Sequence, residues 1–82
     1  MKVKNGMDNQ LNVALFLFTE KMRDRLEQKE RAGYIGWNDR SMITDEQLYV
    51  RALTSLRDGR FVDAANLAMM LQHRQEKNAD VA

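Results

Sequence analysis

The positions of its helix breakers most constrain what this chain can fold into. Its 82 residues include no proline and four glycines, and no stretch alternates apolar and polar residues as a half-buried strand does. Gly33 and Gly59 each follow a run in which apolar residues recur at three- and four-residue steps. The pattern predicts an all-α chain with three helices, over residues 9–32, 45–57 and 60–76, and tails at 1–8 and 77–82.

Local signals at the helix ends support these boundaries. Asp8 or Asn9 is suited to be the first N-cap, since its side chain can accept from a free backbone N–H. Thr44 and Gln47 have the spacing of a capping box, in which each side chain bonds the other residue's backbone N–H. Gly33 is suited to end the first helix.

Two helices carry apolar residues on more faces than two neighbouring helices can cover. Residues 13–18 are all apolar, and residues 61–71 contain two polar side chains, Asp63 and Asn66. A chain of this length buries only about 60% of its unfolded surface, and without cysteine it has no disulfides or thiolate metal sites. We therefore expect a helical bundle completed by homo-oligomerisation, as a dimer or larger; the alternative is a loosely packed monomer.

Charge and length exclude several classes of protein. Thirteen basic and twelve acidic residues give a net charge of +1, so no strong field favours binding to nucleic acid or to a membrane. The apolar run at 13–18 is too short for a signal peptide or a membrane span. We expect a single domain over residues 1–82, in a cytoplasmic protein.

Asp63 and Asn66 lie three residues apart, so their side chains project from one face of the third predicted helix. A carboxylate and an amide oxygen are suitable ligands for a hard cation such as Mg²⁺. The alternatives are a buried hydrogen-bonding pair, or an Asp63 that simply complements the dipole in the first turn of the helix. Spacing alone favours these structural alternatives.

A family resemblance rests on the same segment. Residues 62–71 read VDAANLAMML, which resembles the third-helix signature DVANFAMMI of the MazG-like branch of the all-α nucleoside triphosphate pyrophosphohydrolases. Met22, Leu26, Lys29 and the segment 33–37, GYIGW, resemble that branch's first helix and its Gly-Trp loop, and residues 44–48, TDEQL, resemble the start of its second helix. The resemblance covers residues 18–74. It implies a homo-oligomeric bundle that binds magnesium and cleaves NTPs or dNTPs between the α- and β-phosphates.

The chain departs from that family at the second helix. Thr54, Ser55 and Asp58 stand where the family's E-E-x-x-E motif has three carboxylates. The resemblance therefore leaves a reduced magnesium site of Asp58, Asp63 and Asn66, and magnesium ligation usually includes several carboxylates or substrate phosphates. We expect efficient hydrolysis to be lost, and we assign no catalytic residue.

The resemblance also implies a nucleotide contact after the first helix. Lys29 and Arg31 stand where the family's basic residues meet phosphates, and Tyr34 and Trp37 are suited to stack on a base. The structural alternatives are basic residues that complement a helix C-terminus and a tryptophan that covers a core edge.

Three functions stay open on the sequence. The favoured one is a divergent MazG-like protein, non-catalytic or weakly catalytic, that acts by binding a nucleotide or a partner. The second is an active Mg-dependent NTP/dNTP pyrophosphohydrolase whose missing carboxylates come from elsewhere in the oligomer. The third is a small phage-type accessory protein that binds a host protein through its apolar helices.

Overall fold

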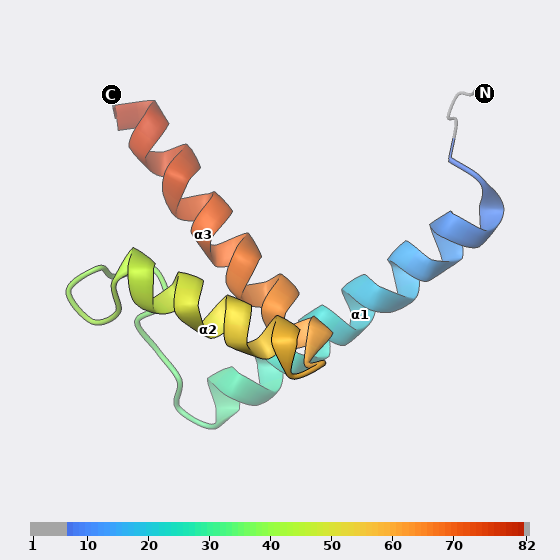
Figure 1. The fold of residues 1–82 in the computed structure, drawn as a ribbon, viewed down its shortest axis with the longest axis horizontal. Helices are drawn as coiled ribbons and strands as arrows, with labels where there is room; N and C mark the ends of the chain where they lie inside the picture. The colour runs from blue at the N-terminus through green and yellow to red at the C-terminus, as the bar shows by residue number, and fades with distance from the viewer. Residues whose placement is uncertain (1–6, 82) are drawn as a thin grey trace.

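Three α-helices make up the described part of the chain. The computed structural model describes residues 7–81, with side chains as far as Lys77; residues 1–6 and 82 lie outside the description. The helices are α1 (Asn9–Arg31), α2 (Asp45–Arg57) and α3 (Phe61–Val81), and residues 7–81 contain no strand (Figure 1). The all-α prediction is therefore confirmed.

The helix ends form as the local signals predict. Asp8 is the N-cap of α1, and its Oδ1 accepts from the Leu11 backbone N–H at 2.7 Å. The capping box at α2 is complete: Thr44 Oγ1 accepts from the Gln47 N–H at 3.1 Å, and Gln47 Oε1 accepts from the Thr44 N–H at 2.8 Å. Gly33 follows α1 with φ +90°, which an L side chain rarely adopts.

The third helix is longer than the sequence pattern predicts. We expected it over 60–76, followed by a tail at 77–82, but α3 begins at Phe61 and continues to Val81. Residues 77–81 include no glycine or proline, so no local breaker ends the helix there. Of the tail expected at 1–8, residues 7 and 8 precede α1 as predicted, while residues 1–6 lie outside the description.

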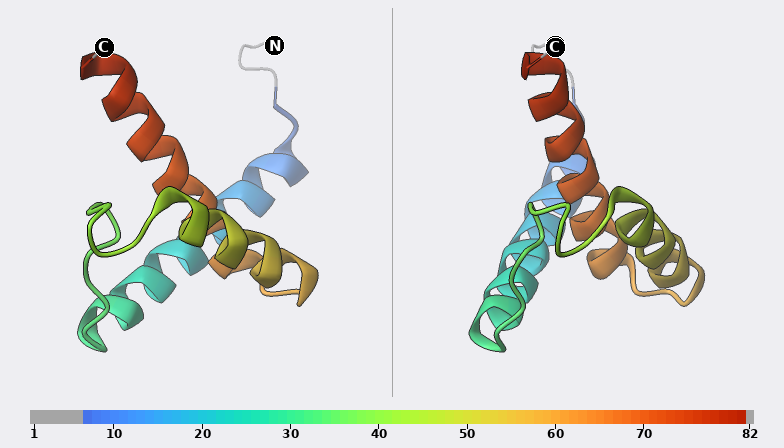
Figure 2. Two further views of the ribbon diagram at one scale, coloured as in Figure 1. Left: turned by 60° about the vertical axis from the view of Figure 1, so that its left-hand side comes forward. Right: turned by 90° about the vertical axis from the view of Figure 1, so that its left-hand side faces the viewer.

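Helix α3 joins the other two helices. A turn at Asp58 and Gly59, with Gly59 at φ +80°, folds α2 and α3 into a helical hairpin, and α1 packs on α3. Within residues 7–81, α1 and α2 do not contact each other, and Figure 2 shows them diverging from α3. The chain is correspondingly extended: its radius of gyration is 15.1 Å, against about 12 Å for a compact domain of this length.

The buried core is small and mostly polar. Leu48 (1% exposed) and Ala64 are the buried apolar residues of the described chain, while Ser55, Asn66 and Arg74 are buried polar ones. No helix in the described part of the chain is long and apolar enough to span a membrane. Core burial alone thus stabilises this arrangement weakly.

The N-terminal half of α1 projects away from the other helices (Figure 1). We call residues 9–18 the α1 arm. Every residue of the arm is exposed except Phe18, which is half-buried. Five of its large apolar side chains are about half exposed or more, namely Leu11, Val13, Leu15, Phe16 and Leu17.

Candidate functional site

A groove of about 920 Å³ lies between α1 and α2, with α3 at its base. Leu26, Leu67 and Met70 are among the apolar side chains that line it. Charged groups of α1 and α2 also line it, such as Lys29 and Arg51. The groove exists because α1 and α2 each pack on α3 but not on each other.

The groove collects most of the site residues predicted from the sequence. It is lined by five of them, from α1, the loop at 32–44 and α3: Lys29, Tyr34, Trp37, Asp63 and Asn66. Arg31, in the last turn of α1, and Asp58, at the C-cap of α2, do not line it. The fold therefore brings together residues that lie more than thirty positions apart in the chain, because α1 packs on α3. The sequence alone does not show this packing.

Asp63 is bound to an arginine of α1. Arg25 Nε donates to Asp63 Oδ1 at 2.8 Å, and Arg25 Nη2 donates to Oδ2 at 3.4 Å, a two-point contact between α1 and α3. The hydrogen bond from Arg25 is the main cause that lowers the pKa of Asp63, and the nearby charges of Lys29 and Arg60 add to it. Asp63 is thus an ionised partner that fixes where the helices cross.

Asn66 is buried at the same crossing. Its Nδ2 donates to the Met22 carbonyl of α1 at 3.3 Å. Its Oδ1 is buried and has no hydrogen-bond donor among the described residues. The amide therefore joins α3 to α1, in line with the structural alternative that the sequence left open.

The three residues predicted to hold magnesium do not fit that ion as they are arranged. Arg60 lies 3.7 Å from an Asp58 carboxylate oxygen and 3.9 Å from one of Asp63, so a guanidinium stands near both carboxylates. Arg57 also pairs with Asp58, at 3.7 Å. The described residues hold no group of three His, Cys, Asp or Glu side chains that could bind a metal ion. An octahedral oxygen shell would require these ion pairs to break.

The predicted nucleotide contacts are partly engaged with each other. Lys29 Nζ lies 4.4 Å from the centre of the Tyr34 ring, a cation–π contact that places the ammonium on one face of that ring. Arg31 and Lys29 are the basic residues of the last turn of α1, where they complement the helix dipole. A phosphate and a base would compete with these contacts.

Trp37 is attached to α3 through its backbone and its ring. Arg74, which is only 2% exposed, donates from Nε to the Trp37 carbonyl at 3.0 Å and from Nη1 to Asp45 Oδ1 at 2.8 Å. The Trp37 ring packs against His73, with ring centres 5.4 Å apart. Arg40 also pairs with Asp45, and the hydrogen bonds from Arg40 and Arg74 lower the pKa of that carboxyl. Arg74 thus ties the loop at 32–44 and the start of α2 to α3.

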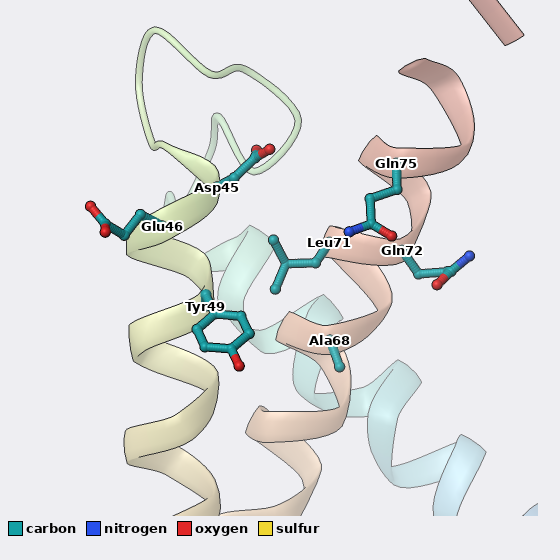
Figure 3. A pocket seen from close by; sticks show the side chains of 7 residues that line it. All are labelled: Asp45, Glu46, Tyr49, Ala68, Leu71, Gln72 and Gln75. Atoms are coloured by element: carbon teal, nitrogen blue, oxygen red, sulfur yellow. The ribbon is translucent and has the colours of Figure 1, made fainter. Parts of the chain in front are cut away.

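A second, shallower hollow of about 430 Å³ lies between α2 and α3. Figure 3 shows Tyr49 and Leu71 projecting into the space between the two helices, with Asp45 and Glu46 at the start of α2. None of the seven predicted site residues lines it. We therefore take the larger groove as the candidate site.

Sequence reasoning missed Arg25 and Arg74. Both have a signal in the sequence, because Arg25 follows Met22 at three residues, and Arg74 follows Leu71 at three, each in phase with an apolar stripe. A cation in phase with an apolar stripe needs a partner inside the fold. The partner itself is set by the tertiary structure.

Comparison of the chain with protein-family models, with curated proteins and with solved structures gave no match. The function is therefore argued from the geometry of the groove.

Proposed function

We propose that this chain is a non-catalytic binding protein whose groove receives an apolar α-helix. One observation carries the proposal: several charged groups of the groove are engaged within the chain, while apolar side chains that line it, such as Val50 and Met69, stay exposed. Arg25 and Arg60 pair with Asp63, and Lys29 lies over Tyr34. An apolar helix can cover these exposed apolar side chains without breaking the Arg25–Asp63 ion pair.

The shape of the groove supports a helical ligand. Its two walls and its base are themselves helices, so a further helix would complete a four-helix arrangement. Methionines contribute to the lining, among them Met22, Met69 and Met70. Their flexible side chains adapt to the ridges of a docked helix, as in other helix-in-groove interactions.

The ion pairs also support binding over hydrolysis. A metal-dependent pyrophosphohydrolase needs carboxylates free to hold the ion that activates water. Here Asp58 and Asp63 both face arginines. The MazG-like resemblance stays a prediction for the ancestry of the fold, and under this proposal the chain keeps its packing without its chemistry.

The single tryptophan is a reporter for the test, because Trp37 lines the groove. We expect a synthetic amphipathic helical peptide of leucine, alanine and glutamine to shift Trp37 emission saturably. A scrambled peptide that cannot form an apolar face is the control. No shift at millimolar peptide would contradict the proposal.

Two lysine substitutions on α2 localise the effect. Val50 (54% exposed) lines the groove, whereas Leu53 (51% exposed) does not. We expect Val50→Lys to weaken peptide binding at least about tenfold, since it places a charge against an apolar helix. Leu53→Lys, with the same charge on the same helix, should leave peptide binding unchanged.

Nucleotide binding is the second candidate, favoured because Lys29, Tyr34 and Trp37 all line the groove and Lys29 lies over the Tyr34 ring. A panel of NTPs and dNTPs, with and without magnesium, tests it by the rise in melting temperature that a ligand of the folded state produces. Val50→Lys separates the two functions, because an added cation should strengthen the binding of a phosphate and weaken that of an apolar helix.

A further inference from the structure

We infer that the groove receives the α1 arm of a second copy of this chain, so that two copies exchange arms around a two-fold axis. The inference rests on the proposed function and names the helix that the groove binds. It accounts both for the exposed apolar side chains of the α1 arm and for the exposed apolar side chains that line the groove.

The first observation is the surface area. A folded monomer of 9.6 kDa exposes about 5,100 Å². This chain exposes 6317 Å². The excess, about 1,200 Å², is larger than the roughly 800 Å² that each partner buries in a standard interface. An interface between two copies that is somewhat larger than standard would bring the chain to an ordinary exposed area.

The second observation is that one apolar stripe runs the whole length of α1. Leu11, Leu15 and Phe18 lie on the arm, and Met22 and Leu26 continue the same three- and four-residue steps along the wall of the groove. An antiparallel pair of α1 helices, with the axis near Thr19, places each arm on the groove wall of the other copy. The lengths agree, since the ten residues of the arm span about 15 Å and the wall from Thr19 to Glu30 about 17 Å.

The third observation is charge. Residues 9–19 contain no charged side chain, whereas charged residues are frequent in the remainder of α1. Next to a two-fold axis a residue meets its own copy, so like charges there would repel. The uncharged segment ends at the proposed axis near Thr19, and an uncharged arm does not compete for the Arg25–Asp63 ion pair.

Apolar side chains lie on several faces of the arm, as expected for a helix that a groove covers on several sides. Val13, Phe16 and Leu17 lie on other faces of the arm than Leu11 and Leu15, and all five are exposed. Pairing two arms alone would cover a single stripe of each. A groove with helical walls and a helical base covers more of the arm.

Sedimentation equilibrium of the full chain is the first test, with wild type expected as a dimer. Leu15→Lys should raise the dimer dissociation constant at least about 100-fold, because two arms lose apolar contact in each dimer. Leu53→Lys is the matched control: Leu53 is 51% exposed against 50% for Leu15, and it lies neither on the arm nor in the groove. It should leave the dimer intact.

Mixing two defective variants tests the reciprocal exchange. Leu15→Lys damages the arm and Val50→Lys damages the groove, so each alone should be monomeric. Mixed in equal amounts they should form a heterodimer, because the sound arm of one enters the sound groove of the other. Dimers that do not reappear on mixing would overturn the exchange of arms.

A disulfide tests the position of the axis without perturbing the interface, since the chain has no cysteine of its own. Thr19→Cys lies near the expected axis and should oxidise readily to a covalent dimer. Leu11→Cys lies about eight residues from it, so its two copies would be more than about 20 Å apart and should stay reduced. Cross-linking at position 11 but not at 19 would overturn the antiparallel arrangement.

Failure of this inference is distinguishable from failure of the proposed function. A wild-type chain that is monomeric at millimolar concentration, yet still shifts Trp37 emission with the leucine-rich peptide, overturns the second copy as occupant and leaves the helix-binding groove. A chain that neither dimerises nor binds the peptide overturns both. A melting temperature raised by nucleotide, in a monomeric chain that does not bind the peptide, overturns both in favour of nucleotide binding.

Discussion

At the scale of single residues, two arginines decide how the helices of this protein meet. Arg25 links α1 to α3 through Asp63, and Arg74 links α3 to the loop at 32–44 and to the start of α2. The two arginines differ in how far their side chains are exposed to solvent. Arg74 is buried, whereas the Arg25 side chain is 41% exposed. Removal of Arg74 is therefore expected to be the more damaging change.

We expect Arg74→Leu to lower the free energy of unfolding by about 2 kcal/mol, because the Trp37 carbonyl loses its donor. Arg74→Lys should fall between this variant and wild type, since one ammonium group cannot reproduce a planar guanidinium that donates from separate nitrogens. Urea unfolding followed by circular dichroism and by Trp37 emission measures both. Arg57→Leu, at a side chain that is 76% exposed, is the control. Equal stability of the two leucine variants would contradict this role of Arg74.

The pKa of Asp63 predicts an acid-sensitive contact. The hydrogen bond from Arg25 lowers this pKa below its ordinary value of 3.8, so the pair stabilises the fold fully above that pH. The contribution is lost as the pH falls from the unfolded-state pKa through the folded-state pKa. Asp63→Asn should therefore be less stable than wild type at pH 7 and should lose less stability between pH 5 and pH 2. Some loss remains, because the pKa values of Asp39 and Asp45 are lowered too. Parallel pH profiles of the two proteins would rule out the ion pair as the cause.

At the scale of elements, each helix end is set by a local contact, and each can be weakened separately. The capping box of α2 is built from the side chains and backbone of Thr44 and Gln47 alone. The loop before it depends on glycine at two positions, Gly33 and Gly36, both with positive φ. These contacts decide where the elements begin and end, but not how the helices cross.

We expect Thr44→Ala to lower the free energy of unfolding by about 1 kcal/mol, because the first turn of α2 loses the acceptor of the Gln47 N–H. Thr44→Ser should be nearly neutral, since it keeps an oxygen at the same place. Chemical denaturation at fixed protein concentration measures the difference. An alanine variant as stable as the serine variant would show that the cap is dispensable.

The two loop glycines form a matched pair. A Cβ on Gly33 would meet no atom within 4 Å, whereas a Cβ on Gly36 would lie 2.7 Å from Met42 Sδ. Both alanine variants bear the strain of a positive φ, about 1–2 kcal/mol. We expect Gly36→Ala to be the less stable of the two, and Met42→Ala to relieve part of that difference. Equal unfolding midpoints for the two glycine variants would contradict the close approach of Met42.

At the scale of the whole molecule, the chain exposes more apolar surface than its small core can offset. Leu48 and Ala64 are the buried apolar residues of the described chain, while the α1 arm and the groove stay open. Stability of this fold should therefore depend on what covers those surfaces. The inferred exchange of arms between two copies would supply such a cover, and its effect on stability would follow mass action.

We expect the thermal unfolding midpoint of wild type to rise with protein concentration from micromolar to millimolar, as for a dimer that unfolds to monomers. Leu15→Lys should show a lower midpoint that does not depend on concentration. Differential scanning calorimetry at several concentrations measures both. A wild-type midpoint that is constant over this range would count against an obligate assembly.

The predictions from sequence held where the signal is local. Asp8, Thr44 and Gln47 act as predicted, because caps involve residues within one helical turn. The predicted end of α3 was wrong by five residues. The helix continues to Val81, because residues 77–81 contain no glycine or proline that would end it. The fold also brings to one groove five residues that the sequence analysis assigns to a nucleotide or a metal: Lys29, Tyr34, Trp37, Asp63 and Asn66. Binding of either ligand stays a prediction.

The sequence by itself determined that this protein is three helices and about where those helices start, and it predicted more apolar surface than two neighbouring helices can cover. These properties depend on neighbours three or four positions away and on composition. Only the tertiary structure decided that Arg25 holds Asp63, 38 positions along the chain, and that α1 and α2 part to leave a groove. The reason is physical: such contacts depend on the angle at which helices cross, and that angle is set by side-chain packing over the whole interface.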